Sequence, residues 1–69
     1  MDATKKVKAV LAYNETNANK LSEWLNITPQ SMSGKFKRNT WSVSDLEKVA
    51  EFTGTNLVIQ FVNKDGTKI

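Results

Sequence analysis

The segment TPQSMSGKFKRN, residues 28–39, gathers side chains that could recognise a nucleic acid. The amide of Gln30 can pair with adenine through two hydrogen bonds, and the hydroxyls of Ser31 and Ser33 can bond a base edge or a phosphate. Cationic and amide side chains that suit backbone phosphates follow them: Lys35, Lys37, Arg38 and Asn39. This segment is therefore the first candidate for a binding site.

A rigid element must hold these side chains, and the same segment predicts a helix. Thr28 is a good N-cap, and Pro29 then falls at the first helical position, where its missing N–H costs nothing. Met32 and Phe36 are one turn apart and form the inner face. We predict a helix over residues 28–38, and the free N–H groups beside Thr28 can also hold a phosphate.

Gly34 lies in the interior of this predicted helix, where glycine costs about 1 kcal/mol relative to alanine. Gly34 is one turn beyond Gln30 on the outer face, so its missing side chain would let the helix sit close to DNA. Alternatively, Gly34 relieves crowding against a neighbouring helix. The sequence leaves both interpretations open.

The composition excludes several kinds of catalytic site. Cysteine and histidine are both absent from the 69 residues. Their absence excludes a disulfide framework, a thiolate nucleophile, a zinc site of the Cys/His type and a histidine-based triad. We expect a protein that is not an enzyme and that uses no cofactor, metal ion or small-molecule ligand.

The positive charge is concentrated in the first part of the sequence. Residues 1–40 carry a net charge of +4, whereas residues 41–69 carry −1, within a total of +3. A polyanion such as DNA would dock most favourably on the first part.

Hydrophobic periodicity predicts further helices on both sides of the candidate segment. Residues 3–13 carry an apolar stripe of helical spacing. A second helix, capped by Thr16 or Asn17, is expected to end at Leu25, because Asn26 tolerates the left-handed conformation. The candidate segment would then be the third helix.

A fourth helix is expected between a capping box at its start and a glycine at its end. Ser42 can cap it together with Asp45, and Gly54 supplies the exit. There is no flexible linker, so we interpret residues 1–69 as a single domain.

Two groups of residues near the candidate site have a structural interpretation. Trp24 and Trp41 are interpreted as packing residues rather than as platforms for stacked bases. Lys5, Lys6 and Lys8 are interpreted as a solvated helix face, with phosphate contact as the alternative.

After the fourth helix the hydrophobic period changes from 3.6 to 2, and residues 56–69 predict a β-hairpin. A three-residue loop with Gly66 left-handed sets Phe61 opposite Ile69. A two-residue loop would instead set Val62 opposite Ile69. We favour the first register because it pairs two large apolar side chains on one face.

Residues 4–54 resemble the Cro/C1-type (XRE-like) helix-turn-helix domain of phage repressors and small bacterial regulators. The matching positions are the apolar, small, turn and cap residues of the pattern: Leu21, Ser22, Leu25, Asn26, Ile27, Thr28, Met32, Leu46, Val49 and Ala50. Asn26 and Ser22 stand where glycine and alanine are more usual, and Ala18 replaces a frequent glutamine. The resemblance implies a mostly α fold, a four-helix Cro/repressor-like helix-turn-helix domain with a short C-terminal β-hairpin.

The resemblance also implies that the helix over residues 28–38 reads the major groove of DNA. The expected function is a sequence-specific transcriptional regulator, a repressor of phage or mobile-element origin in the bacterial cytoplasm or nucleoid. The expected DNA-binding residues are Thr28, Gln30, Ser31, Ser33, Gly34, Lys35, Lys37, Arg38 and Asn39.

No run of apolar residues is long enough to cross a membrane, and no signal-peptide pattern is present.

The hairpin is expected to make the protein a homodimer. Both of its faces are largely apolar, and family members of the Cro kind dimerise through C-terminal strands, so a partner chain is expected on its open edge. The expected interface residues are Leu57, Val58, Ile59, Gln60, Phe61 and Val62. Such a dimer would read a palindromic operator.

Two other functions remain as alternatives. One is a protein-interaction or antitoxin-like module that uses the hairpin to bind a different protein. The other is an architectural or excision factor that binds DNA without strong sequence preference.

Overall fold

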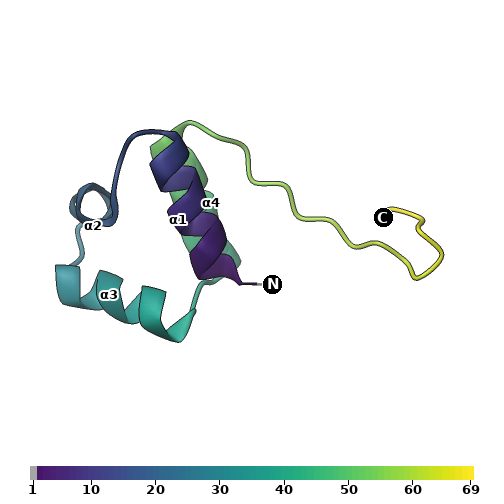
Figure 1. The fold of residues 1–69 in the computed structure, drawn as a ribbon, viewed down its shortest axis with the longest axis horizontal. Coiled ribbons are helices and arrows are strands. Elements are labelled where there is room, and N and C mark those ends of the chain that lie inside the picture. The colour runs from purple at the N-terminus through teal and green to yellow at the C-terminus, as the bar shows by residue number, and fades with distance from the viewer. Residues whose placement is uncertain (1) are drawn as a thin grey trace.

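Side-chain caps mark where each helix of this protein begins. The computed structural model describes residues 2–69, which contain four α-helices: α1 (Ala3–Tyr13), α2 (Ala18–Leu25), α3 (Pro29–Arg38) and α4 (Val43–Thr53) (Figure 1). The residue before each helix accepts a first-turn N–H with its side-chain oxygen: Asp2, Asn17, Thr28 and Ser42. The four predicted helices are therefore confirmed, with Asn17 rather than Thr16 as the cap of α2.

Left-handed residues end three of the helices. Asn26 after α2 has a φ of 58°, and Gly54 after α4 has a φ of 68°, as predicted from their tolerance of this conformation. Asn39 ends α3 in the same way, with a φ of 52°. The chain can therefore reverse sharply between consecutive helices.

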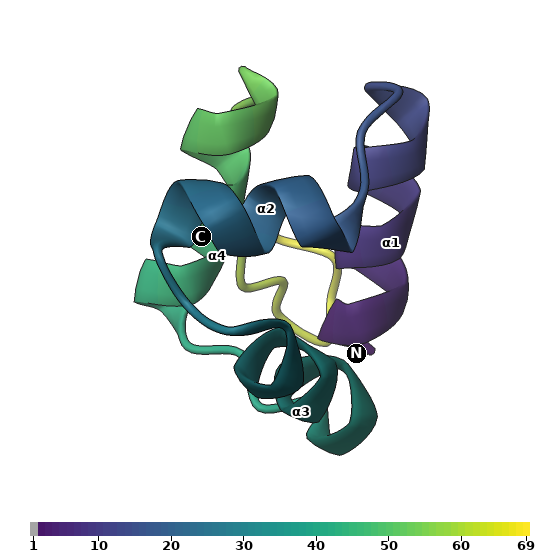
Figure 2. The same ribbon diagram turned by 90° about the vertical axis from the view of Figure 1, so that its left-hand side faces the viewer.

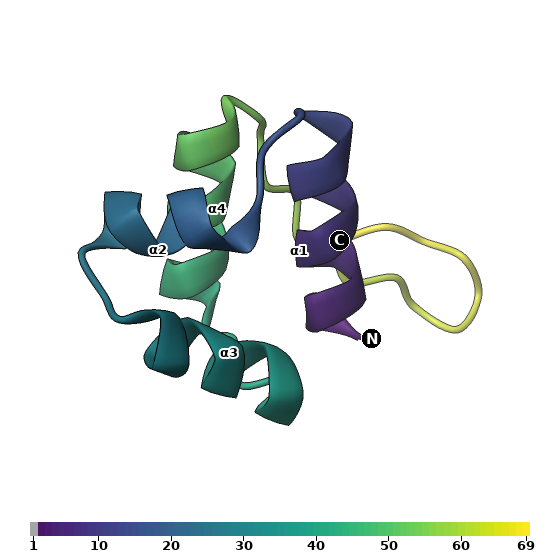
Figure 3. The same ribbon diagram turned by 60° about the vertical axis from the view of Figure 1, so that its left-hand side comes forward.

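All four helices contribute to one small core. In the views of Figures 2 and 3, α1 and α4 stand side by side, α2 crosses them, and α3 lies across one end of the pair. Each helix places apolar side chains at the centre: Val7, Leu11, Leu21, Met32 and Val49. Met32 of α3 is only 2% exposed and Phe36 is half-buried against the core, so the predicted inner face of α3 is confirmed.

The predicted C-terminal β-hairpin is wrong, because residues 2–69 contain no β-strand. Residues 55–69, called the arm below, run away from the helices as an extended chain that ends in a turn (Figure 1). A single antiparallel bridge joins Val62 and Lys68. The turn between them has Gly66 at a φ of 92°, and the N–H of Ile69 donates to the carbonyl of Phe61 at 2.9 Å.

The turn at Gly66 does not grow into a hairpin in the described residues. Its pairing is limited to the bridge between Val62 and Lys68. The segment from Asn56 to Gln60, which was expected to pair, has no strand beside it. A two-stranded ribbon is marginal in water even when it is fully paired, so this short pairing stops at one bridge.

Candidate nucleic-acid interface

The outer side of α3 presents the side chains that the sequence predicted to read DNA. With Met32 and Phe36 turned to the core, the 100° rotation per residue places Gln30, Gly34 and Lys37 on the opposite side. Gln30, Ser33 and Lys37 are exposed, and none forms a side-chain hydrogen bond or ion pair within residues 2–69. These groups are therefore available to a ligand.

Gly34 lies directly beneath the guanidinium group of Arg38, one turn later on the same helix. A Cβ atom added to Gly34 would come within 2.6 Å of Arg38 Nη2. The nearest atoms therefore belong to a flexible side chain of α3 itself. The predicted alternative, that Gly34 relieves crowding against a neighbouring helix, is not supported. Close approach to DNA at Gly34 stays a prediction.

The hydroxyl of Thr28 caps α3 and also bonds the hydroxyl of Ser31. Thr28 Oγ1 accepts the N–H of Ser31 at 3.1 Å and lies 3.1 Å from Ser31 Oγ, to which it donates. Both residues are exposed. A ligand at this end would meet this hydroxyl pair and the amide of Gln30 together.

Lys35 has a structural role that its position in a basic run did not reveal. Its Nζ is 2.9 Å from Asp45 Oδ2 and lies 6.0 Å from the centroid of the Trp41 ring, so Lys35 ties α3 to the start of α4. Asp45 in turn closes the capping box of α4 by accepting the N–H of Ser42 at 3.1 Å. Lys35 was predicted to bind DNA, but its charge is already neutralised by Asp45.

The surroundings of Asp45 favour its ionised form. Partial burial opposes ionisation, but the hydrogen bond from the N–H of Ser42 and the adjacent Lys35 ammonium group outweigh it. Together they hold the pKa of Asp45 below its ordinary value of 3.8. The ion pair between α3 and α4 is therefore present at neutral pH.

Asn39 is also turned inward, towards α1. Its Oδ1 accepts the N–H of Thr4 at 2.9 Å and the hydroxyl of Thr4 lies 3.1 Å away. The predicted contact of Asn39 with a phosphate would have to use its Nδ2, because its oxygen joins the end of α3 to the first turn of α1.

Thr4 is a structural residue of this region whose role the sequence interpretation missed. Its hydroxyl is placed to donate to the carbonyl of Phe36 at 3.1 Å or to Asn39, and it accepts the indole N–H of Trp41 at 2.9 Å. Thr4 is buried on the same stripe of α1 as Val7 and Leu11. A hydroxyl on an otherwise apolar stripe was the available signal, because a buried hydroxyl needs partners.

The aromatic side chains pack on each other. The rings of Phe36 and Trp41 are 5.3 Å apart and tilted, and those of Trp24 and Phe52 are 5.5 Å apart. These distances are typical of paired aromatic rings. The interpretation of both tryptophans as packing residues agrees with these contacts, although Trp24 remains 45% exposed.

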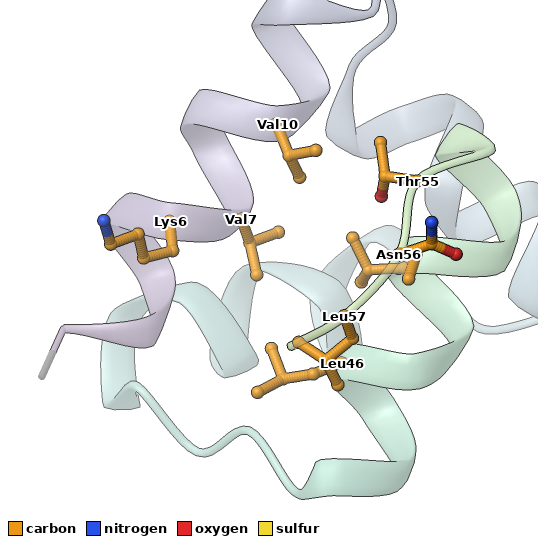
Figure 4. Close-up of a pocket in the computed structure, with 9 residues that line it drawn as sticks. Lys6, Val7, Val10, Leu46, Thr55, Asn56 and Leu57 are labelled. Carbon is orange, nitrogen blue, oxygen red and sulfur yellow. The ribbon is translucent and has the colours of Figure 1, made fainter. Parts of the chain in front are cut away.

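A second surface is formed by the arm and the groove at its root. The predicted interface residues Leu57 to Val62 are all exposed, Val58 by 78% and Phe61 by 75%. Leu57 at the root lines a cavity of about 230 Å³ between α1 and α4 (Figure 4). A larger groove of about 820 Å³ continues along the arm, past Trp41 and Val43. Beyond this root the arm runs away from the helices (Figure 1).

No helix in residues 2–69 is long and apolar enough to cross a membrane. No group of three or more acidic residues there could hold a metal ion.

Comparisons of this chain with models of protein families, with curated proteins and with solved structures find no match.

Proposed function

We propose that this protein binds double-stranded DNA through the outer side of α3 and acts as a sequence-specific transcriptional regulator. The observation that carries the proposal is the division of α3 into two sides. Met32 is buried in the core, whereas Gln30, Ser33 and Lys37 are exposed and uncommitted on the other side. A helix fixed from behind and polar in front suits the major groove of DNA.

The arrangement of α2 and α3 supports a helix-turn-helix domain of the Cro/repressor-like kind. The two helices pack against each other and are joined by residues 26–28 alone, with Asn26 left-handed at the turn. A short turn between two packed helices is the pattern of this motif. α2 would then lie across the DNA backbone while α3 enters the groove.

The chemistry of α3 divides between reading and holding the DNA. The Gln30 amide lies near the N-terminal end. It can donate to N7 of adenine and accept from N6 at the same time, and this pair of hydrogen bonds is matched to adenine. Lys37 and Arg38, in the last turn, suit the phosphates of the backbone, and the charge of α3 is concentrated there. Specificity would come from the first turns and affinity largely from the last.

The arm supports a homodimer in this proposal. Its apolar residues Val58, Ile59 and Phe61 are each more than half exposed in the single chain, and burying them against the same residues of a second copy would remove that area from water. The backbone of this extended segment is also free to pair with a partner strand. A two-fold dimer would set two α3 helices roughly 34 Å apart, over a palindromic operator, and binding there would repress transcription.

Selection of DNA duplexes from a random pool tests this function directly. A dimeric reader is expected to enrich a palindromic motif, with half-sites spaced by about one helical turn, near 10 base pairs. Enriched duplexes should keep most of their advantage over mixed-sequence DNA when binding is repeated at higher salt. Binding without any enriched motif, lost entirely with salt, would instead indicate an architectural factor. Absence of binding at low salt would exclude DNA as the ligand.

The arm also supports a second candidate, a protein-interaction or antitoxin-like module. The same exposed residues, Val58 and Phe61 above all, could bury themselves against a different protein. In that case the purified chain should remain a monomer and bind no duplex. The two candidates therefore differ in both oligomeric state and DNA binding.

A further inference from the structure

Lys8 belongs to α1, yet its ammonium group is held at α3. Its Nζ lies 6.0 Å from the centroid of the Phe36 ring, a distance at which a cation is attracted to an aromatic face. Lys8 is exposed and forms no ion pair among the residues that the structure describes. The ring occupies one side of the ammonium group, and its remaining N–H groups can donate to an anion.

Lys8 lies on the flank of α1 that turns away from the arm. Lys6 and Val10 line the cavity beside the arm, and two residues of helix rotate Lys8 by roughly 200° from Lys6. On α3, Lys35 faces α4 through Asp45, and Lys37 is rotated from it by the same roughly 200°. Lys8 and Lys37 therefore both turn away from the part of the molecule that α4 and the arm occupy.

The hydrogen bonds of Thr4 hold the first turn of α1 against the C-terminal end of α3. Thr4 joins the first turn of α1 to the carbonyl of Phe36 and to Asn39, at the C-terminal end of α3. Lys8 is one turn beyond Thr4 on α1, and Lys37 and Arg38 lie in the last turn of α3. The helix segments that carry Lys8 and Lys37 are therefore joined directly by hydrogen bonds.

We propose that Lys8 holds a backbone phosphate of DNA, so that the interface extends from α3 onto α1. In this arrangement Lys8 replaces Lys35, whose charge Asp45 neutralises at 2.9 Å. This phosphate would flank the groove that α3 enters, because Lys8 lies beside α3 rather than at the end of α3 that enters the groove. This inference rests on the proposed DNA binding and adds a contact to it.

Counterion release tests the contact. A plot of log affinity against log salt falls, and each phosphate that a protein neutralises makes this fall steeper by about 0.9. The binding of a labelled mixed-sequence duplex, and of any duplex enriched by selection, would be measured between about 50 and 200 mM salt. Lys8→Gln is expected to reduce the magnitude of this negative slope by about 0.9. Lys6→Gln, the same change on the arm-facing flank of α1, is expected to leave it unchanged.

The outcomes separate this inference from the function on which it rests. If the wild-type protein binds DNA and Lys8→Gln keeps the wild-type slope, the phosphate contact is wrong and DNA binding stands. If Lys6→Gln lowers the slope as much as Lys8→Gln, the effect reflects net charge and the contact is again wrong. If the wild-type protein does not bind at low salt, both proposals fail. Thermal unfolding by circular dichroism would verify that both variants keep their helices.

Discussion

The side-chain oxygen of Asn39 accepts the backbone N–H of Thr4 at 2.9 Å, across 35 residues of sequence. This bond joins the left-handed end of α3 to the first turn of α1, and the Thr4 hydroxyl adds Phe36 and Trp41 to the same junction. The face that we propose for DNA is therefore fixed at its C-terminal end by polar bonds. Met32 fixes its middle by burial in the core.

Replacing Thr4 by valine should destabilise the protein more than replacing it by serine. Thr4→Val keeps the shape but leaves the partly buried indole N–H of Trp41 without its acceptor; an unsatisfied donor costs about 1–3 kcal/mol when fully buried, which is the upper bound here. Thr4→Ser keeps the hydroxyl and loses one methyl group, worth about 0.8 kcal/mol. Urea unfolding compares the free energies, and the Trp41 indole resonance should shift in Thr4→Val alone. Equal stabilities and unshifted spectra would show that the hydroxyl contributes nothing.

Gly34→Ala should stabilise the fold and weaken DNA binding. Alanine favours a helix interior by about 1 kcal/mol over glycine, and the group it would meet is the movable end of Arg38. Gly54→Ala is the matched control, because Gly54 has a φ of 68° and alanine is strained there by about 1–2 kcal/mol. Melting temperatures should move in opposite directions. Unchanged DNA affinity in Gly34→Ala would show that the helix does not approach DNA closely at this point.

The ion pair between Lys35 and Asp45 should make stability depend on acid pH. The folded pKa of Asp45 is below its ordinary 3.8, so the ionised carboxyl contributes stability that is fully present well above that pH. The contribution is lost as the pH falls through the lowered pKa. Asp45→Asn removes this titration, while the other carboxyls titrate in both proteins.

The measurement is the difference in unfolding free energy between wild type and Asp45→Asn across the acid range. Both partners are about a quarter exposed, so a difference of about 1 kcal/mol or less is expected at neutral pH. It should shrink towards zero in acid. A difference that stays constant with pH would mean that the ion pair contributes nothing.

The helices could be predicted because their signals are local. Thr28 and Pro29 define the start of α3 within two residues, and Ser42 and Asp45 define the start of α4 within four. Asn26 could be assigned to a left-handed turn because few residue types tolerate that conformation. Each of these inferences depends on neighbours in sequence alone.

The roles of Lys35, Asn39 and Thr4 could not be predicted in this way. Asp45 is ten residues from Lys35, and Thr4 is thirty-five from Asn39, so each contact exists only once the helices have packed. A basic run therefore overstated the charge available to a ligand. The prediction of a hairpin in the arm was wrong for a different reason. Alternating apolar residues predict a strand, but they do not supply the partner strand that it needs.

Gln30 and Lys37 should differ in how their loss affects DNA binding. Gln30→Ala should relax the preference at one base pair in each half-site, costing about 1–3 kcal/mol there, because a bidentate pair is lost. Lys37→Ala should weaken all sequences alike and lower the salt slope by about 1. Binding to the enriched duplex and its single-base variants separates the two effects. Equal losses on every sequence for both variants would contradict the assignment of Gln30 as a base reader.

Phe61→Ser should convert a dimer into a monomer without disturbing the helices. Phe61 is 75% exposed in the single chain, so its removal should not affect the core. Truncating an aromatic residue at the centre of an interface typically costs roughly 2 kcal/mol or more, which raises the dissociation constant more than tenfold. Tyr13→Ser, which also removes an exposed aromatic ring but at the end of α1, should leave the dimer intact. Sedimentation equilibrium at tens of micromolar measures both, and a wild-type monomer at that concentration would count against dimerisation through the arm.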